Sequence, residues 1–336
     1  MTDPTVDPQS AAGAPGSNAL SPDELGFFKR NGYLIVRNAL NAELCARTRE
    51  RLWSSLPAQS DLRRDDATTH VGPFSDADRQ LDVQDLRDGY RWQLRSAGTE
   101  RLLIDLVFSE RLRGIAEALL GPGTLQPPKV GGSTMGRQGP AWPGGPVDPA
   151  LDNEGVRGIY CTLPYGDRPR EPDAAHTDGH PFNLGVVGLI DDVPPDGGAF
   201  KVWPGSHRRL YPTFALRYDQ PRIPYYDHLP SYKGIVHTEA YLEELERIVA
   251  DTPPVDCHGK SGDVVFWHHR TAHMAGHNYS SVIRQAVLYD FCRTDLDEAR
   301  QAPADAPMWR DWSEALQSAS DTYPEAFAAT QNLQVS

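Results

Sequence analysis

The stretch HTDGHPFNL, residues 176–184, places two histidines and an aspartate directly before the apolar run LGVVGLI at 184–190. Such a run is typical of a buried strand, and polar residues at its approach need something to hold them there. In an extended chain, residues two apart point to the same face with Cα atoms about 6.5 Å apart. His176 and Asp178 are therefore expected to face one space, where an imidazole and a carboxylate can meet a single metal ion.

This pair alone is a weak signal for a metal site, because the chain contains 11 histidines and such pairs arise by chance. His237 and Glu239 form a second pair of the same kind, but they open a predicted helix and no strand follows them. Further candidate ligands occur in GDVVFWHHRTAHMAGHN at 262–278, namely His268, His269, His273 and His277. A metal site depends on whether one of these joins His176 and Asp178.

His273 is the favoured third ligand, because it follows a predicted strand end and a bend and stands before Gly276. Two histidines and one carboxylate form the facial triad of non-heme Fe(II) oxygenases, which leaves coordination positions open. Arg284 lies in the next apolar strand, where burial of a guanidinium is costly without an anionic partner. Its position predicts that Arg284 grips a carboxylate of a diacid co-substrate in a bidentate pair.

Four segments, in this order, resemble the phytanoyl-CoA dioxygenase (PhyH) family of Fe(II)/2-oxoglutarate-dependent oxygenases. They are SPDELGFFKRNGYLIVRNAL (21–40), HTDGH (176–180), DGGAFKVWPGSH (196–207) and GDVVFWHHRTAHMAGHN (262–278) followed by Arg284, and the resemblance covers about 21–295. It implies a double-stranded β-helix with Fe(II) bound by His176, Asp178 and His273. It also implies 2-oxoglutarate held by Arg284, with O2 as the second co-substrate.

One position departs from the family pattern. The family often has a small hydroxyl residue two positions after the distal histidine, where this chain has Ala275. Thr162, or Tyr160 on the same face of the preceding predicted strand, is the candidate for contacting the keto-acid end of 2-oxoglutarate. Other histidines have simpler interpretations: His180 and His207 as turn residues, and His268 and His269 as residues that pack beside or orient the site.

The order of predicted elements indicates an α+β fold, because helical patterns precede a run of short strands. Evenly spaced strands without intervening helices favour an antiparallel jelly-roll or cupin-like core with flanking N-terminal helices. We expect a disordered tail (1–20), a single oxygenase domain (21–300) and a C-terminal helical extension (301–336). Within the domain we expect a jelly-roll core (about 158–295), an insertion that forms a lid (208–261), and a Gly- and Pro-rich loop beside it (121–158).

The bulk composition limits the possible partners and location of the protein. The chain has 336 residues, 39% hydrophobic residues and a formal net charge of -13, which is a poor match for nucleic acid or anionic membranes. No apolar run approaches the ~20 residues that a membrane span needs, and the N-terminus lacks the pattern of a signal peptide. The 4 cysteines are scattered and predict free thiols. We therefore expect a cytoplasmic protein that acts on a small molecule, with its oligomeric state left open.

The predicted activity is hydroxylation of an unactivated C–H bond in a secondary metabolite, such as an amino sugar or a modified amino acid. Acidic residues near the predicted site (Glu171, Asp173, Asp191 and Asp192) suggest a cationic or hydroxyl-rich substrate. The resemblance also implies oxygenation rather than halogenation, because relatives that halogenate have a small residue in place of the carboxylate ligand, and Asp178 is intact. Oxidative ring closure of the orthoester type and desaturation use the same site and remain alternatives. A different class, a cupin-like metal-dependent protein that binds or isomerises a sugar, needs no Arg284 in an apolar strand.

Overall fold

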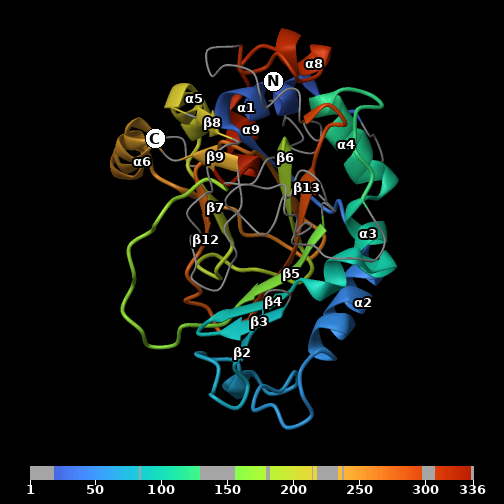
Figure 1. The fold of residues 1–336 in the computed structure, drawn as a ribbon, viewed down its shortest axis with the longest axis vertical. Coiled ribbons are helices and arrows are strands. Elements are labelled where there is room, and N and C mark those ends of the chain that lie inside the picture. Colours follow the sequence, from blue (N-terminus) through green and yellow to red (C-terminus); the bar gives the residue numbers. More distant parts are fainter. Residues whose placement is uncertain are drawn as a thin grey trace, which may run out of the picture.

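One wall of the fold is an antiparallel sheet of eight strands in the order β1-β11-β6-β13-β5-β4-β3-β2 (Figure 1). The computed structural model describes residues 19–82, 85–128, 156–178, 182–213, 215–217, 234–236, 238–296 and 307–333. The strands are β1 (Tyr33–Val36), β2 (Gln80–Leu81), β3 (Asp85–Asp88), β4 (Arg91–Leu94), β5 (Val156–Thr162), β6 (Leu184–Leu189), β11 (Val264–His268) and β13 (Arg284–Phe291).

A smaller antiparallel sheet faces this wall. Its strands are β10 (Val255–Asp256), β7 (Phe200–Val202) and β12 (His273–Ala275), and a separate pair is formed by β8 (Ala215–Arg217) and β9 (Gly234–Val236). Phe200 of the small sheet contacts Trp267 of the large one, with ring centroids 4.7 Å apart, so the two sheets share an interior. The arrangement is the double-stranded β-helix that the sequence predicts, in an α+β chain.

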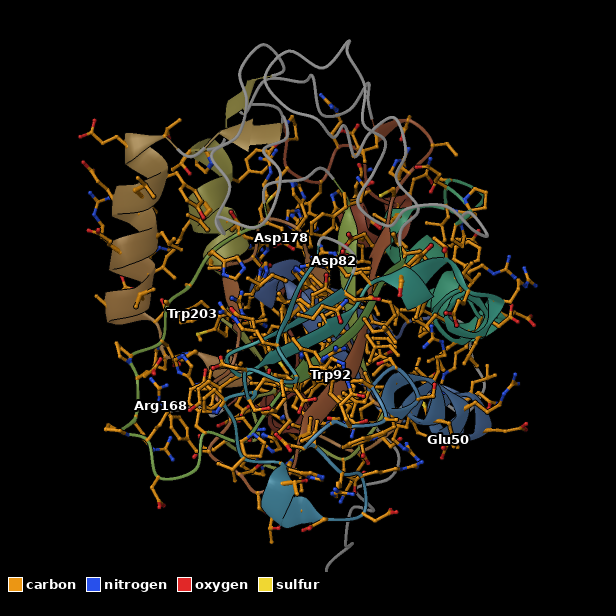
Figure 2. The ribbon with its side chains drawn as sticks, turned by 60° about the horizontal axis from the view of Figure 1, so that its bottom comes forward. Glu50, Asp82, Trp92, Arg168, Asp178 and Trp203 are labelled. Atoms are coloured by element: carbon orange, nitrogen blue, oxygen red, sulfur yellow. The ribbon has the colours of Figure 1, made fainter. Side chains whose placement is uncertain are left out.

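Helices lie outside the two sheets, and some of them cover one side of the large sheet (Figure 1). The helices are α1 (Pro22–Asn31), α2 (Ala42–Trp53), α3 (Arg101–Val107), α4 (Glu110–Leu120), α5 (Ser206–Leu210), α6 (Glu239–Asp251), α8 (Glu314–Ser318) and α9 (Glu325–Thr330). In Figure 1, α2, α3 and α4 follow one side of the sheet, and Figure 2 shows Trp92 beside α2. Trp92 of β4 packs against Trp53 at a centroid distance of 5.4 Å. Tyr289 and Phe291 of β13 pack against Phe108 between α3 and α4, so the alternate residues of β13 face the interior.

Local signals in the sequence explain where several elements begin and end. Ser21 and Glu24 form a capping box at the start of α1, and Gly32 ends that helix in the left-handed conformation. Asn41 caps α2 through its side chain. The strands expected at 184–190, before His273, around Arg284 and around Thr162 are present as β6, β11, β13 and β5. Strands β2, β3 and β4 lie in the largely polar stretch 54–98.

The C-terminal segment contacts the edge strand β1. Gln331 accepts a hydrogen bond from the backbone N–H of Ile35 at 2.6 Å and donates one to the Ile35 carbonyl at 3.2 Å. These bonds satisfy backbone groups that an edge strand leaves open. The expected domain division remains a prediction, and most of its tail (1–20), the loop 129–155, the insertion residues 218–233 and His180 lie outside the described residues. Among the described helices, none combines the length and apolar character needed to cross a membrane.

A bulge in β5 turns one side chain toward the interior. Leu288 pairs with Gly158 and Tyr289 with Val156, so Arg157 is the extra residue in the ladder. Gly158 has φ +109°, and a Cβ there would lie 2.3 Å from the carbonyl oxygen of Leu94. Only glycine therefore fits this bulge without a shift of the backbone.

We expect Gly158→Ala to lower the free energy of unfolding by about 1–3 kcal/mol, because it adds a strained φ and a backbone clash. Chemical denaturation monitored by circular dichroism measures this loss. Gly123→Ala is the matched control, since Gly123 also has a positive φ, +68°, but open space where its Cβ would lie. An equal loss in both variants would show that the contact with Leu94 contributes nothing.

Candidate metal centre

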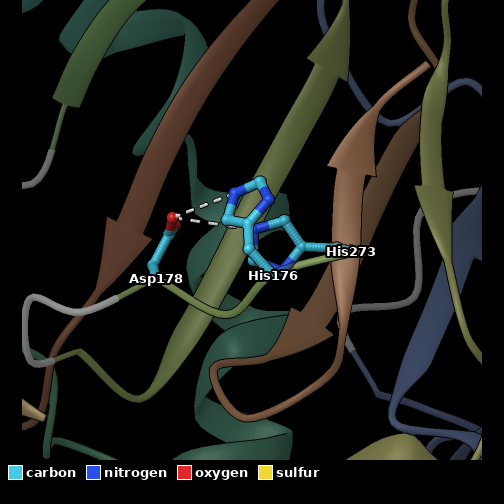
Figure 3. A group of neighbouring side chains, drawn as sticks. All are labelled: His176, Asp178 and His273. Atoms are coloured by element: carbon cyan, nitrogen blue, oxygen red, sulfur yellow. Dashed lines mark ion pairs between the residues drawn. The ribbon is translucent and has the colours of Figure 1, made fainter. Parts of the chain in front are cut away.

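Backbone pairing brings together the two histidines of the site, which come from separate segments. His176 donates its N–H to the carbonyl of His273 at 3.0 Å, and His273 donates back at 2.9 Å. This isolated bridge extends from β12 to the segment that follows β5. It places the two imidazole rings with centroids 4.6 Å apart (Figure 3).

Asp178 completes a cluster of three potential ligands. Its Oδ1 lies 3.8 Å from Nε2 of His176 and 3.6 Å from Nε2 of His273. Two ligand atoms that bind one ion at about 2.1 Å each can lie up to about 4.2 Å apart, so both distances suit a shared ion. Among the described residues, this is the one group of three His, Cys, Asp or Glu side chains spaced to hold a metal.

The tautomer of His273 is set by its backbone surroundings. Its Nδ1 lies 2.9 Å from the carbonyl oxygen of Thr271, which can only accept a hydrogen bond. Nδ1 must therefore carry the proton, and the lone pair of Nε2 is directed to the cluster. The ring is 4% exposed and packs near Phe200 and Trp267, at centroid distances of 5.1 and 5.6 Å.

Thr177, which lies between the potential ligands His176 and Asp178, is anchored to the insertion. Thr177 is fully buried, and its backbone N–H donates to the hydroxyl of Tyr241 at 3.1 Å. The two hydroxyl groups of Thr177 and Tyr241 lie 2.9 Å apart. Because Tyr241 lies on α6, a helix of the insertion helps to fix the segment that carries His176 and Asp178.

Sequence reasoning missed two charged residues of the site: Arg157, which lies beside Asp178, and Asp290, which pairs with Arg157. Nη1 of Arg157 is 2.7 Å from Oδ2 of Asp178, and Nε of Arg157 donates to Oδ2 of Asp290 at 2.6 Å. Arg157 comes from β5 and Asp290 from β13, two strands rich in apolar residues. A charged side chain in each strand was the available signal, but the face that Arg157 takes depends on the bulge in β5.

Arg284 lies where the sequence places it, buried at the start of β13 with 3% of the residue exposed. Its Nη1 donates to the carbonyl oxygen of Tyr160 at 3.2 Å, while its Nε finds no partner among the described residues. Burial lowers the pKa of Arg284 to about 10, so the guanidinium remains charged at neutral pH. It shares the inner face of β13 with Asp290, since the positions of the two residues in the strand differ by an even number.

Thr162 and Tyr160, the proposed helpers of Arg284, lie on the neighbouring strand. Thr162 is the direct partner of Arg284 in the β5–β13 ladder and is 6% exposed, so both side chains belong to one face. The hydroxyl of Tyr160 accepts a hydrogen bond from Nε of Arg95 at 3.0 Å. Thr162 is therefore better placed than Tyr160 to act together with Arg284.

The other histidines that the structure describes lie outside the triad. His268 stacks on Trp312 at a centroid distance of 4.9 Å, and burial holds its pKa well below the usual value. His207 is buried beside α1, and burial lowers its pKa to about 3. His277 lies 3.8 Å from Glu171 and 3.9 Å from Asp173.

The acidic residues that suggested a cationic substrate are engaged in other contacts. Asp173 pairs with Lys201 at 2.9 Å, Asp192 with Lys260 at 2.9 Å and Glu171 with Arg168 at 2.5 Å, while Asp191 accepts from Gln285 at 3.1 Å. Arg168 lies at the periphery in Figure 2, away from Asp178. These partners neutralise or occupy the carboxylates, so closeness in sequence is no argument for a cationic substrate.

One family model and several solved structures match this chain. The family model "Phytanoyl-CoA dioxygenase (PhyH)" matches residues 28–286. The crystal structure of the non-heme α-ketoglutarate-dependent carbocyclase SnoK from nogalamycin biosynthesis is 20% identical, with TM-score 0.44, covering 87% of this chain and 95% of that one. EctD from S. alaskensis with bound Fe is 17% identical, with TM-score 0.48 and coverages of 87% and 83%. AviO1 from Streptomyces viridochromogenes Tue57 is 16% identical, with TM-score 0.41 and coverages of 81% and 95%. A search of curated sequences found no match.

Proposed function

Because the chain belongs to the phytanoyl-CoA dioxygenase (PhyH) family of Fe(II)/2-oxoglutarate-dependent oxygenases, we propose that it is a dioxygenase that hydroxylates an unactivated C–H bond of a small molecule. The observation that supports this most directly is the meeting of His176, Asp178 and His273 in one cluster. We assign the iron to these three side chains. We assign the far carboxylate of 2-oxoglutarate to Arg284.

The donor set of the cluster suits Fe(II). Two neutral imidazole nitrogens and one carboxylate oxygen leave other coordination positions for the co-substrates. When bound, the iron supplies the coupling of 2-oxoglutarate decarboxylation and O2 reduction to oxidation of the substrate. The chain supplies the fixed positions: Thr271 holds the tautomer of His273, and Tyr241 holds the backbone between His176 and Asp178.

Arg284 fits the second carboxylate of 2-oxoglutarate for two reasons. The buried Nε has hydrogen-bonding capacity that the described residues do not use, and a guanidinium binds a carboxylate through two parallel hydrogen bonds. The incoming carboxylate also offsets the cost of burying the charge. Thr162, on the same face, is proposed as the hydroxyl that assists Arg284 in place of the residue missing at Ala275.

The interior walls favour exclusion of water from the reaction. Phe200 and Trp267 flank His273, and Phe182 packs near Trp267 at a centroid distance of 6.1 Å. Gly185 makes room for the indole of Trp267, since a Cβ there would lie 2.2 Å from the ring. A dry apolar wall strengthens the electrostatic contacts made by the co-substrate. We also propose that the insertion at 208–261 serves as the lid, which the Thr177–Tyr241 contact supports.

The proposal predicts that the purified protein, supplied with Fe(II) and 2-oxoglutarate in air, slowly releases succinate even without its primary substrate. O2 uptake measured with an electrode should match the succinate released. Chelation of the metal should stop both. A cupin-like protein that binds or isomerises a sugar would consume neither O2 nor 2-oxoglutarate, and that result would overturn the oxygenase assignment.

A further inference from the structure

We propose that Arg157 and Asp290 act as a positioning pair that holds Asp178 so that only one of its carboxylate oxygens can bind the metal. This inference rests on the proposed function, since it concerns a ligand of the assigned iron. The pair comes from two neighbouring strands of the large sheet, β5 and β13. Neither residue is needed as a ligand itself.

The two carboxylate oxygens of Asp178 have different neighbours. Oδ2 lies 2.7 Å from Nη1 of Arg157, whereas Oδ1 lies 3.6 Å from Nε2 of His273 and 3.8 Å from that of His176. The remaining face of the guanidinium is used by Asp290. Nε and Nη2 of Arg157 donate to its two oxygens at 2.6 and 2.7 Å, a bidentate pair. One side of Arg157 is therefore anchored, and the other is free to hold Oδ2.

Asp290 makes this arrangement compatible with a dication. A lone guanidinium beside Asp178 would repel the metal ion and compete with it for the carboxylate. Asp290 has 3% of its side chain exposed and supplies a compensating negative charge. Burial lowers the pKa of Arg157, but the carboxylates of Asp178 and Asp290 together hold that pKa well above its usual value. Arg157 and Asp290 together are neutral, so they orient the ligand without changing the charge that the ion meets.

The backbone shows that the inward direction of Arg157 is built into the fold. In a regular ladder the residue before Gly158 would point to the outer, helix-covered face. The bulge at Arg157 reverses this direction, and only glycine fits at the next position. The guanidinium also lies over the ring of Phe182, 5.2 Å from its centroid.

The consequence for the site concerns the number of open positions on the metal. A carboxylate that binds through one oxygen leaves room for the keto acid and for O2. A carboxylate that rotates to bind through both oxygens would occupy one of those positions. Loss of the positioning pair should therefore weaken metal binding and change the coordination geometry, in addition to any effect on turnover.

The test compares metal binding by the metal-free full chain and by the double variant Arg157→Met/Asp290→Leu. This variant removes both charges together, so it leaves no unpaired charge of the pair in the interior. Circular dichroism and thermal melting first establish that it is folded. Calorimetric titration with Mn²⁺ should then show binding about 10- to 100-fold weaker, the usual effect of losing a residue that orients a ligand. The absorption spectrum with Co²⁺ should shift as well.

Controls make the outcome specific. Arg51→Met/Glu100→Leu removes another bidentate pair, with contacts of 3.0, 3.0 and 2.7 Å, on the outer side of the fold, and should leave Mn²⁺ affinity unchanged. If the double variant does not fold, Arg157→Lys serves instead, because lysine keeps the positive charge and lacks the two parallel donors of the guanidinium. Wild-type Mn²⁺ affinity and an unchanged Co²⁺ spectrum in a folded variant would overturn the positioning role. If Asp178→Ala also bound Mn²⁺ normally, the metal assignment itself would fail.

Discussion

Replacement of Asp178 or His273 by alanine is expected to lower the rate of 2-oxoglutarate turnover by more than about 100-fold. Loss of a residue that only orients a metal ligand typically lowers activity by about 10- to 100-fold, and loss of the ligand itself should have a larger effect. Each side chain supplies one of three ligand atoms that lie within 4.8 Å of one another. With two ligands left, the ion is held more weakly and its geometry is no longer fixed. Succinate release at saturating Fe(II) measures the effect, and Mn²⁺ titration of the same variants measures binding separately from chemistry.

His258→Ala is the matched control for these variants. His258 is a histidine outside the cluster, with 35% of its side chain exposed, near Asp256 at 3.9 Å. Its replacement should leave both Mn²⁺ affinity and succinate release close to wild type. Turnover by Asp178→Ala and His273→Ala at the parent rate would remove both residues from the metal site and end the oxygenase mechanism proposed for it.

Arg284→Met is expected to raise the KM for 2-oxoglutarate, with a loss of about 2–4 kcal/mol for a buried charge-assisted pair. This corresponds to roughly 30- to 700-fold in KM. Methionine keeps much of the volume of the arginine side chain and removes its charge, so the substitution leaves only a small cavity. Steady-state rates at varied 2-oxoglutarate and saturating Fe(II) measure the change. Mn²⁺ affinity should stay at the wild-type value, because Arg284 contacts no metal ligand among the described residues.

The stability of Arg284→Met provides an independent check. In the free protein the charge is buried and makes one described hydrogen bond, to the carbonyl of Tyr160. Its removal should therefore leave the melting temperature of the ligand-free protein unchanged or higher. Addition of 2-oxoglutarate with Mn²⁺ should raise the melting temperature of the wild type more than that of the variant. An unchanged KM would exclude Arg284 from the co-substrate site.

Much of the fold follows from signals carried by adjacent residues. The capping box at Ser21, the cap at Asn41 and the apolar strands need only local chemistry, and the structure contains all of them. Strands β2 to β4 could not be predicted this way. Their residues are largely polar, as in Asp85–Asp88, and they become strands because β4 pairs with β5. Pairing with a neighbour overrides weak intrinsic preference.

The sequence by itself determined the kinds of side chain at the site and their spacing: a histidine and an aspartate before a strand, a distal histidine, and an arginine within an apolar run. Only the tertiary structure decided how these groups are held. The bulge that turns Arg157 inward arises from the register between β5 and β13, and Asp173, Asp192 and Asp191 are paired with lysine and glutamine partners from other segments. Register and pairing depend on contacts between residues far apart in the chain, whereas caps, periodicity and ligand chemistry are properties of neighbours.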